Sequence, residues 1–271
     1  MLGLSYRHTE EVLAALGCRS GKSSVERDVS RAGQKARELH RQAPRMRVRI
    51  LGVDGTGAAM AGGDAGMLFF VGFGAGGGLI GVEAVHEEQA QEVRRHVRRV
   101  LAEVGAEELR TDEHSAYKGI VPEDRHRLCL THWLKSKCKR ASELYRQAVA
   151  QQRPLEAQSM LELLALLRLR PRPPTVPEGL ERLVGRYIRC RTGLLWKINQ
   201  LLQHVERTWE QVSDDPVDPT NNATERLIGL TFKIRAKTMR GFKSMAKVLA
   251  HPHLSFFLRG QDGVCDLRKV I

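Results

Sequence analysis

The chain of 271 residues lacks any run of about 18 uncharged apolar residues, so we expect no membrane-spanning segment. Its start has no charged stretch followed by an apolar one, and we therefore expect no signal peptide. Its five cysteines are an odd number in a long chain. That number argues against a disulfide framework and favours a reducing compartment such as the cytoplasm.

Negative charge is scarce relative to positive charge. Lysine and arginine together number 44, aspartate and glutamate 31, and the formal net charge is +13. The composition, 42% hydrophobic and 28% charged, is typical of a folded globular protein rather than a disordered one. Such a positive excess predicts a polyanionic partner, with nucleic acid ahead of an anionic membrane surface.

The first forty residues predict two helices. One apolar face runs through residues 6–16, and Gly17 follows in the position of a left-handed C-terminal cap. Residues 20–24 offer the N-cap of a second helix. This outline fits a helix-turn-helix as well as an ordinary helical hairpin. In the first interpretation, four residues at the start of the recognition helix contact DNA: Lys22, Ser23, Ser24 and Arg27.

Short apolar runs separated by glycines follow, and they predict an antiparallel meander, an amphipathic helix and a further strand. The expected elements are strands at 48–53, 67–73 and 79–85, a helix at 86–104 and a strand at 108–111. The first and last of these strands end at Asp54 and Asp112. The glycines of 72–78 match G-x-G-x-x-G, but a strand follows them instead of the helix that a dinucleotide site requires.

The second half of the chain is predominantly helical. The helical pattern covers 132–210, a loop at 214–222 ends in helix-capping residues, and a last helix begins near Glu225. Asp54, Asp112 and Glu225 thus come from three separate elements. Three carboxylates that converge can hold two Mg²⁺ or Mn²⁺ ions for phosphoryl transfer. Each acid could equally be a helix cap or a member of a surface ion pair.

Four segments, in this order, resemble the DDE transposases of bacterial insertion sequences, in the Mutator-like group with a helical insertion. They are VDGT around Asp54, TDEHSAYKGI around Asp112, LCLTHWLKSK with its C-x-x-H pair, and NNATER through RGFKS at 221–244. The resemblance implies an α/β fold, with an RNase H-like mixed sheet flanked by helices. The implied organisation is a helical DNA-binding segment at 1–47, a core in two parts at 48–140 and 214–271, and an all-α insertion at 141–213.

The resemblance also implies an activity. Asp54, Asp112 and Glu225 would be catalytic and bind two Mg²⁺ or Mn²⁺ ions, which serve hydrolysis at the transposon end and attack of the freed 3′-hydroxyl on target DNA. The partners would be the terminal inverted repeats, target DNA and at least one further copy of the chain. The location would be the cytoplasm of a bacterium, at the nucleoid. A DNA-binding protein without catalysis, or an RNase H-like nuclease that does not join ends, is the alternative.

Cys129 and His132 form the C-x-x-H pair, for which the resemblance implies a supporting role. Together with His126 and Cys138 they could instead bind zinc, although the spacing is unlike that of paired zinc-ligand motifs. Asn222, one turn before Glu225, could orient that acid or serve as a helix cap.

The segment after Glu225 is basic and has no acid before Asp262, which predicts phosphate contacts. The expected DNA-binding residues here are Arg226, Lys233, Arg235, Lys237, Arg240 and Lys243. Trp196, in the insertion, is a candidate for stacking on a base near the cleaved end, or else a core residue.

Overall fold

The protein is α/β, with one mixed sheet and flanking helices, in a computed structural model that describes residues 5–43, 47–60, 63–73, 78–86, 88–169, 176–212, 221–234, 236 and 242–259. The fold class expected from the sequence is confirmed at this level. The chain divides into two compact units. The first contains Met1–Val121 and Asn221–Ile271, and the second contains Pro122–Thr220. None of the described helices combines the length and the apolar character needed to cross a membrane.

The strands of the first unit follow the order β3-β2-β1-β4, and β5 belongs to the second unit. Their bounds are β1 (Ile50–Met60), β2 (Gly63–Phe73), β3 (Leu79–Ala84), β4 (Glu108–Thr111) and β5 (His126–Leu128). The first three form an antiparallel meander, and β4 pairs with β1 in parallel. The predicted meander is therefore confirmed. The strand β3 after the glycines also agrees with the absence of a dinucleotide-binding helix there.

The first strand is longer than its apolar pattern predicts. We expected it to end at Val53, whereas β1 continues through Asp54 to Met60. Two pairings of different length explain the difference. The parallel pairing with β4 ends at Gly52, but the antiparallel pairing with β2 continues to Met60 opposite Gly63. Asp54 therefore lies inside a strand, at the point where one of its two neighbours ends.

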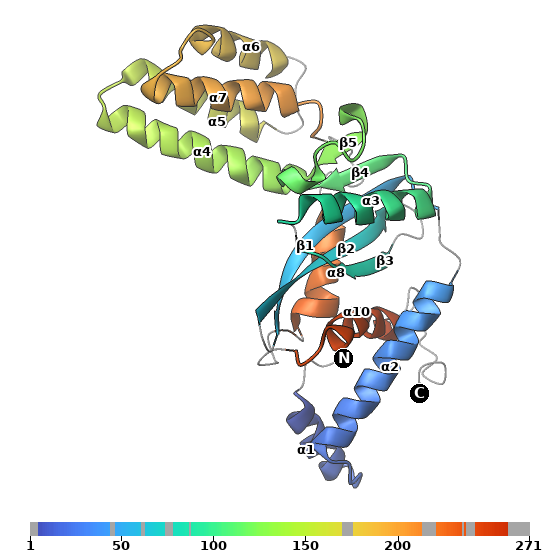
Figure 1. The fold of residues 1–271 in the computed structure, drawn as a ribbon. Coiled ribbons are helices and arrows are strands. Elements are labelled where there is room, and N and C mark those ends of the chain that lie inside the picture. The colour runs from blue at the N-terminus through green and yellow to red at the C-terminus, as the bar shows by residue number, and fades with distance from the viewer. Residues whose placement is uncertain are drawn as a thin grey trace. The chain divides into compact units, whose positions relative to one another are not determined.

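Helices cover both faces of the sheet in the first unit (Figure 1). On one face, Leu68 and Phe70 pack with α3 (Ala90–Val104). On the other, Met67 and Phe69 pack with α8 (Asn222–Ile228), the π-helical turn η3 (Gly229–Lys233) and α10 (Met245–Arg259). Alternate residues of β2 thus supply two hydrophobic cores.

The N-terminal helices are α1 (Tyr6–Ala15) and α2 (Lys22–Gln42). Gly17 has φ +81°, which confirms the left-handed cap expected there. Along its inner face α2 packs on α10, where Gly33 allows close approach to Ala250 and His40 Nδ1 lies 2.7 Å from His253 Nδ1. Sequence reasoning missed α10. It therefore missed that the N-terminal segment packs on the C-terminal part of its own unit.

The second unit is a helical bundle. It contains α4 (Leu130–Ala150), α5 (Pro154–Arg168), α6 (Val176–Tyr187) and α7 (Gly193–Thr208), which confirms the helical pattern predicted for this region. Trp133 lies in its core and donates a hydrogen bond from Nε1 to Thr208 Oγ1. Tyr187 donates its hydroxyl to Ser159, and burial raises the pKa of this phenol.

Candidate functional site

Asp54 and Asp112 come from neighbouring parallel strands. Gly52 of β1 pairs with Arg110 of β4. Asp54 lies two residues after Gly52 on β1, and Asp112 lies two residues after Arg110, directly after the end of β4. Paired strands lie about 4.8 Å apart. The two aspartates therefore leave adjacent strands at the same level, where the parallel pairing ends.

Both aspartates face the side of the sheet that α8 covers. Leu51, Val53 and Leu109 pack into the core beneath α3. Because successive side chains of a strand alternate between faces, Asp54 points to the opposite face, and the same alternation, continued by one residue past the end of β4, would direct Asp112 there. Both are half-buried, so that their carboxylates remain accessible to solvent.

Local backbone groups orient the two carboxylates. Asp54 Oδ1 accepts the N–H of Gly55 at 2.9 Å. Asp112 Oδ1 accepts the N–H of His114 at 3.0 Å, where η1 (Ser115–Tyr117) begins. Each aspartate thus uses one carboxylate oxygen in a hydrogen bond to the backbone one or two residues later.

Glu225 lies on α8, whose start is bound to β1. Asn221 donates its Nδ2–H to the carbonyl oxygen of Val53 at 3.1 Å, and Thr224 donates its hydroxyl to Asn221 Oδ1 at 2.6 Å. Asn221 and Thr224 are fully buried. Glu225 follows Asn221 by four residues and therefore shares the helix face that meets the strand. All three predicted acids lie in the first unit, on one face of its sheet.

A glycine allows this close approach of helix and strand. A Cβ at Gly52 would lie 2.8 Å from Thr224 Oγ1 and 2.9 Å from Asn221 Oδ1. Sequence reasoning missed Gly52, Asn221 and Thr224. It selected Asn222, which is exposed. The two consecutive asparagines at 221 and 222 were a sequence signal for a buried polar contact. Choosing between them requires knowing which side of the helix faces β1.

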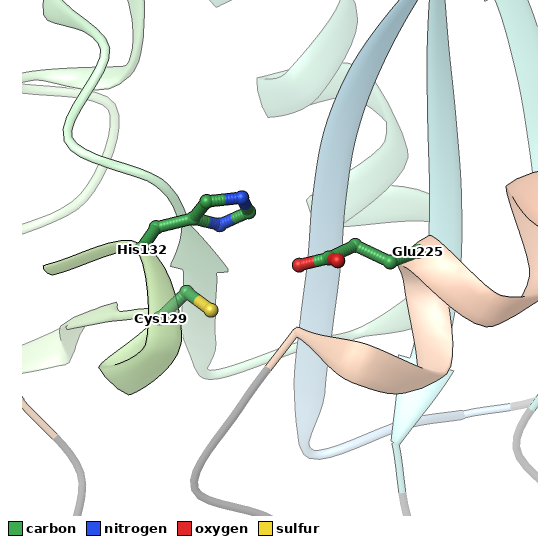
Figure 2. Close-up of side chains that lie close together, drawn as sticks. All are labelled: Cys129, His132 and Glu225. Carbon is green, nitrogen blue, oxygen red and sulfur yellow. The ribbon is translucent and has the colours of Figure 1, made fainter. Parts of the chain in front are cut away.

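Cys129 and His132 lie in the second unit, at the start of α4. Cys129 is the buried N-cap residue, and His132 is half-buried in the first turn. Figure 2 shows their side chains extending from this turn, and that of Glu225 extending from α8. His126 lies in β5 and Cys138 further along α4, as the sequence predicted. His126 and Cys138 do not join Cys129 and His132 in a ligand cluster among the described residues.

The donor chemistry of the three acids fits a hard divalent cation, because carboxylate oxygens are the ligands that Mg²⁺ and Mn²⁺ prefer. Within either unit taken alone, however, the described residues contain no three ligand atoms close enough to hold one ion. Asp54, Asp112 and Glu225 share a face without meeting at one point.

The predicted DNA-contacting residues are distributed over both units. Lys22, Ser23 and Arg27 are exposed at the start of α2, and Ser24 is half-buried there. In the second unit Trp196 is 42% exposed and therefore not a core residue. The other described members are exposed, namely Arg226, Lys233 and Lys243. Arg235, Lys237 and Arg240 lie outside the described residues.

Comparison with known proteins gives no matching family model and no matching curated protein.

Proposed function

We propose that the chain is a DDE transposase that binds the ends of a mobile element, cleaves them and joins them to target DNA. The observation that supports the proposal is the parallel pairing of β1 with β4, which ends two residues before Asp54 and Asp112, next to the strand segment to which Asn221 binds the helix of Glu225. We also propose that the sheet and its helices are an RNase H-like core, with the second unit as its helical insertion.

In this mechanism the protein positions groups instead of supplying a nucleophile. Asp54, Asp112 and Glu225 would hold two Mg²⁺ or Mn²⁺ ions. Such ions, when bound, activate a hydroxyl nucleophile and stabilise the charge that develops on the attacking and leaving oxygens. Asn221 and Thr224 keep α8 against β1, so that Glu225 remains on the face of the two aspartates. The half-buried position of the acids limits the water around them.

The exposed cations would bind the DNA backbone. Arg27, Arg31 and Lys35 lie on successive turns of α2, and all three are exposed. In the described part of the chain, none of them has a carboxylate within 4.0 Å. Unopposed cations in one row suit a row of phosphates. We propose a helix-turn-helix-like role for α1 and α2, and at least a dimer on DNA at the bacterial nucleoid.

A second candidate is a DNA-binding protein of the same fold that does not cleave. The observation that favours it is that the oxygens of the three acids are not gathered to ligand distance. This candidate predicts DNA binding that is independent of divalent ions.

The test begins with the DNA that flanks the gene, where inverted repeats would supply the end substrate. Duplex ends are incubated with the full chain, a plasmid target and Mg²⁺ or Mn²⁺, and the products are separated on gels. We expect cleaved and joined species with the wild type and none with Asp112→Asn. Asp64→Asn, an exposed acid on β2, is the matched control and should retain activity. Cleavage without joining would favour a nuclease. Binding without either product would favour the second candidate.

A further inference from the structure

Two histidines connect the N-terminal and C-terminal helices of the first unit. His40 lies in the last turn of α2 and His253 lies in α10, and their Nδ1 atoms are 2.7 Å apart. The two rings meet edge to face, with their centres separated by 4.9 Å, and Phe256 stacks on the other ring of the pair, that of His40. His253 is 5% exposed and His40 is half-buried. A direct hydrogen bond between imidazoles thus joins residues 213 positions apart in the chain.

This hydrogen bond restricts the number of protons that the two rings can hold. An imidazole nitrogen accepts a hydrogen bond only when it carries no proton, so one of the two Nδ1 atoms must be unprotonated. A charged imidazole carries a proton on each ring nitrogen and is a donor only. Both rings therefore cannot be charged while the bond is intact. This holds whichever ring is the donor, and whatever the Nε2 atoms contact.

The groups next to His40 on α2 do not compensate a second positive charge. Arg37 lies three residues before His40, and Arg41 follows it directly. Glu38 is the acid closest to His40 in the sequence of α2, but it lies about 200° away around the helix, on the exposed side. The neighbours of His40 on its own helix are therefore cations.

The elements that pack around α2 and α10 contribute few available acids. Their further charged or titratable groups include Tyr6 on α1, Lys247, His251 and Arg259 on α10, Glu83 on β3 and Lys233 on η3. Glu83 already pairs with Arg99, and Glu26 of α2 already pairs with Lys247. Neither acid is thus a ready counter-ion for a second charged imidazole.

We propose that His40 and His253 form a proton-sensitive latch, which holds α2 against α10 while at least one of the two rings is neutral and opens when both are charged. Gly33 packs on Ala250 in the same interface, but that apolar contact does not respond to pH. The latch does not rest on the proposed function. Because α2 also carries the exposed basic row, however, its opening would release the proposed DNA-binding helix.

The direction of the pH effect follows from counting protons. Free imidazoles take up protons near pH 6.5, so well below this value the unfolded chain holds two protons on these residues, whereas the closed latch holds at most one. Stability therefore falls as the pH falls below about 6.5, by up to about tenfold in the unfolding constant per pH unit for the excluded proton. The Glu26 carboxyl does not titrate in this range, because the hydrogen bond from Lys247 lowers its pKa.

The variant His40→Asn separates protonation from packing. The asparagine amide occupies the place of Nδ1 and can keep a hydrogen bond to His253, but it cannot become charged. Chemical unfolding of the full chain is measured from about pH 7.5 to about pH 5. We expect the folding constant of the wild type to fall at least about tenfold more over this range than that of His40→Asn. Identical pH profiles would overturn the proposal.

His8→Asn is the matched control. His8 is an exposed histidine on α1, and removal of its ring should leave the pH profile of the wild type unchanged. A profile of His8→Asn that matches that of His40→Asn would overturn the proposal, because the effect would then follow from the loss of any histidine.

Nuclear magnetic resonance of the ¹⁵N-labelled imidazoles counts the protons directly on the wild type. Exchange of the α2 amides, corrected for the intrinsic pH dependence, reports whether the latch is closed. We expect only one of the two rings to become charged while α2 remains protected, and protection of α2 to be lost when the second ring is charged. Two charged rings with α2 still protected would overturn the proposal, even if His40→Asn does not fold. Neither measurement uses DNA, so failure of strand transfer would concern the proposed function alone.

Discussion

Asn221 donates its Nδ2–H to the carbonyl oxygen of Val53 at 3.1 Å, a bond between residues 168 positions apart. Val53 directly precedes Asp54, and Asn221 precedes Glu225 by one helical turn. The buried side-chain amide of Asn221 thus connects the helical turn that leads to Glu225 with the strand residue that precedes Asp54. The bond lies inside one compact unit, even though the whole second unit separates its partners in the chain.

Replacing Asn221 by alanine is expected to destabilise the first unit by about 1–3 kcal/mol. The change leaves the Val53 carbonyl without this donor and the Thr224 hydroxyl without its acceptor. Chemical unfolding of the full chain measures the loss. Asn222→Ala, at the exposed neighbouring position, is the control and should cost clearly less. A similar cost for both variants would argue that helix capping, and not the bond to Val53, explains the effect.

Replacing Gly52 by alanine is expected to cost about 1–3 kcal/mol through overpacking. The new methyl group would meet the Phe73 ring at 2.1 Å, together with Thr224 and Asn221, so that α8 must shift away from β1. Gly57, on the same strand, has nothing within 4 Å of an added Cβ. Gly57→Ala should therefore fold with almost unchanged stability. Equal losses for the two alanines, measured by chemical unfolding, would contradict this packing.

The sequence predicts much of the first unit, because its signals there are local. Alternating apolar runs and glycines predict the meander and β4, and the 3.6-residue pattern predicts α3. Asp54 and Asp112 both follow the paired segment of β1 and β4, and this could be expected once the two strands were known to be parallel neighbours. The extension of β1 to Met60 did not follow, because it depends on pairing with β2 and not on apolar character.

The missed features depend on contacts distant in the chain. The basic segment containing α10 includes Pro252, which gives no simple helical signal, and its partner α2 lies more than two hundred residues earlier. Arg110 did leave a signal. It lies in the four-residue strand β4 next to Leu109, and it is 1% exposed. Because helices cover both faces of the sheet, a charged side chain in this strand is buried on whichever face it occupies.

The ion pair between Lys247 and Glu26 predicts a pH dependence. It joins α10 to α2, and the hydrogen bond from Lys247 lowers the pKa of Glu26. Because this pKa is lower in the folded state, the stabilisation is fully present above the unfolded value of about 4.3. It is lost as the pH falls through the folded value.

Glu26→Gln should therefore lower the free energy of unfolding near neutral pH by less than about 1 kcal/mol. The difference from the wild type should disappear in acid, below the folded pKa. Unfolding curves over a pH series measure both parts. Glu38→Gln, an exposed acid on the same helix, should show no such trend. A difference that persists in acid would mean that the pair acts through packing.

The basic row on α2 predicts the salt dependence of DNA binding. Removal of one cation that binds a phosphate should reduce the slope of log affinity against log salt by about 0.9. Joint substitution of Arg27, Arg31 and Lys35 by glutamine should thus reduce the slope by about 2–3 on a short random-sequence duplex. The measurement is fluorescence anisotropy over a salt series. Affinity should weaken similarly for every sequence, because backbone contacts carry no base information.

The control removes the same charge from α3, by glutamine at Arg95, Arg98 and Arg99. Arg95 and Arg99 already pair with Glu92 and Glu83, so they have less positive charge to offer a phosphate. We expect a clearly smaller change in slope. Equal changes for the two triple variants would mean that net charge, and not the face of α2, determines binding. Cations on α2 and on α3 would then contribute equally to DNA binding. The role of α2 would be to pack on α10, and it would not be the DNA-binding surface.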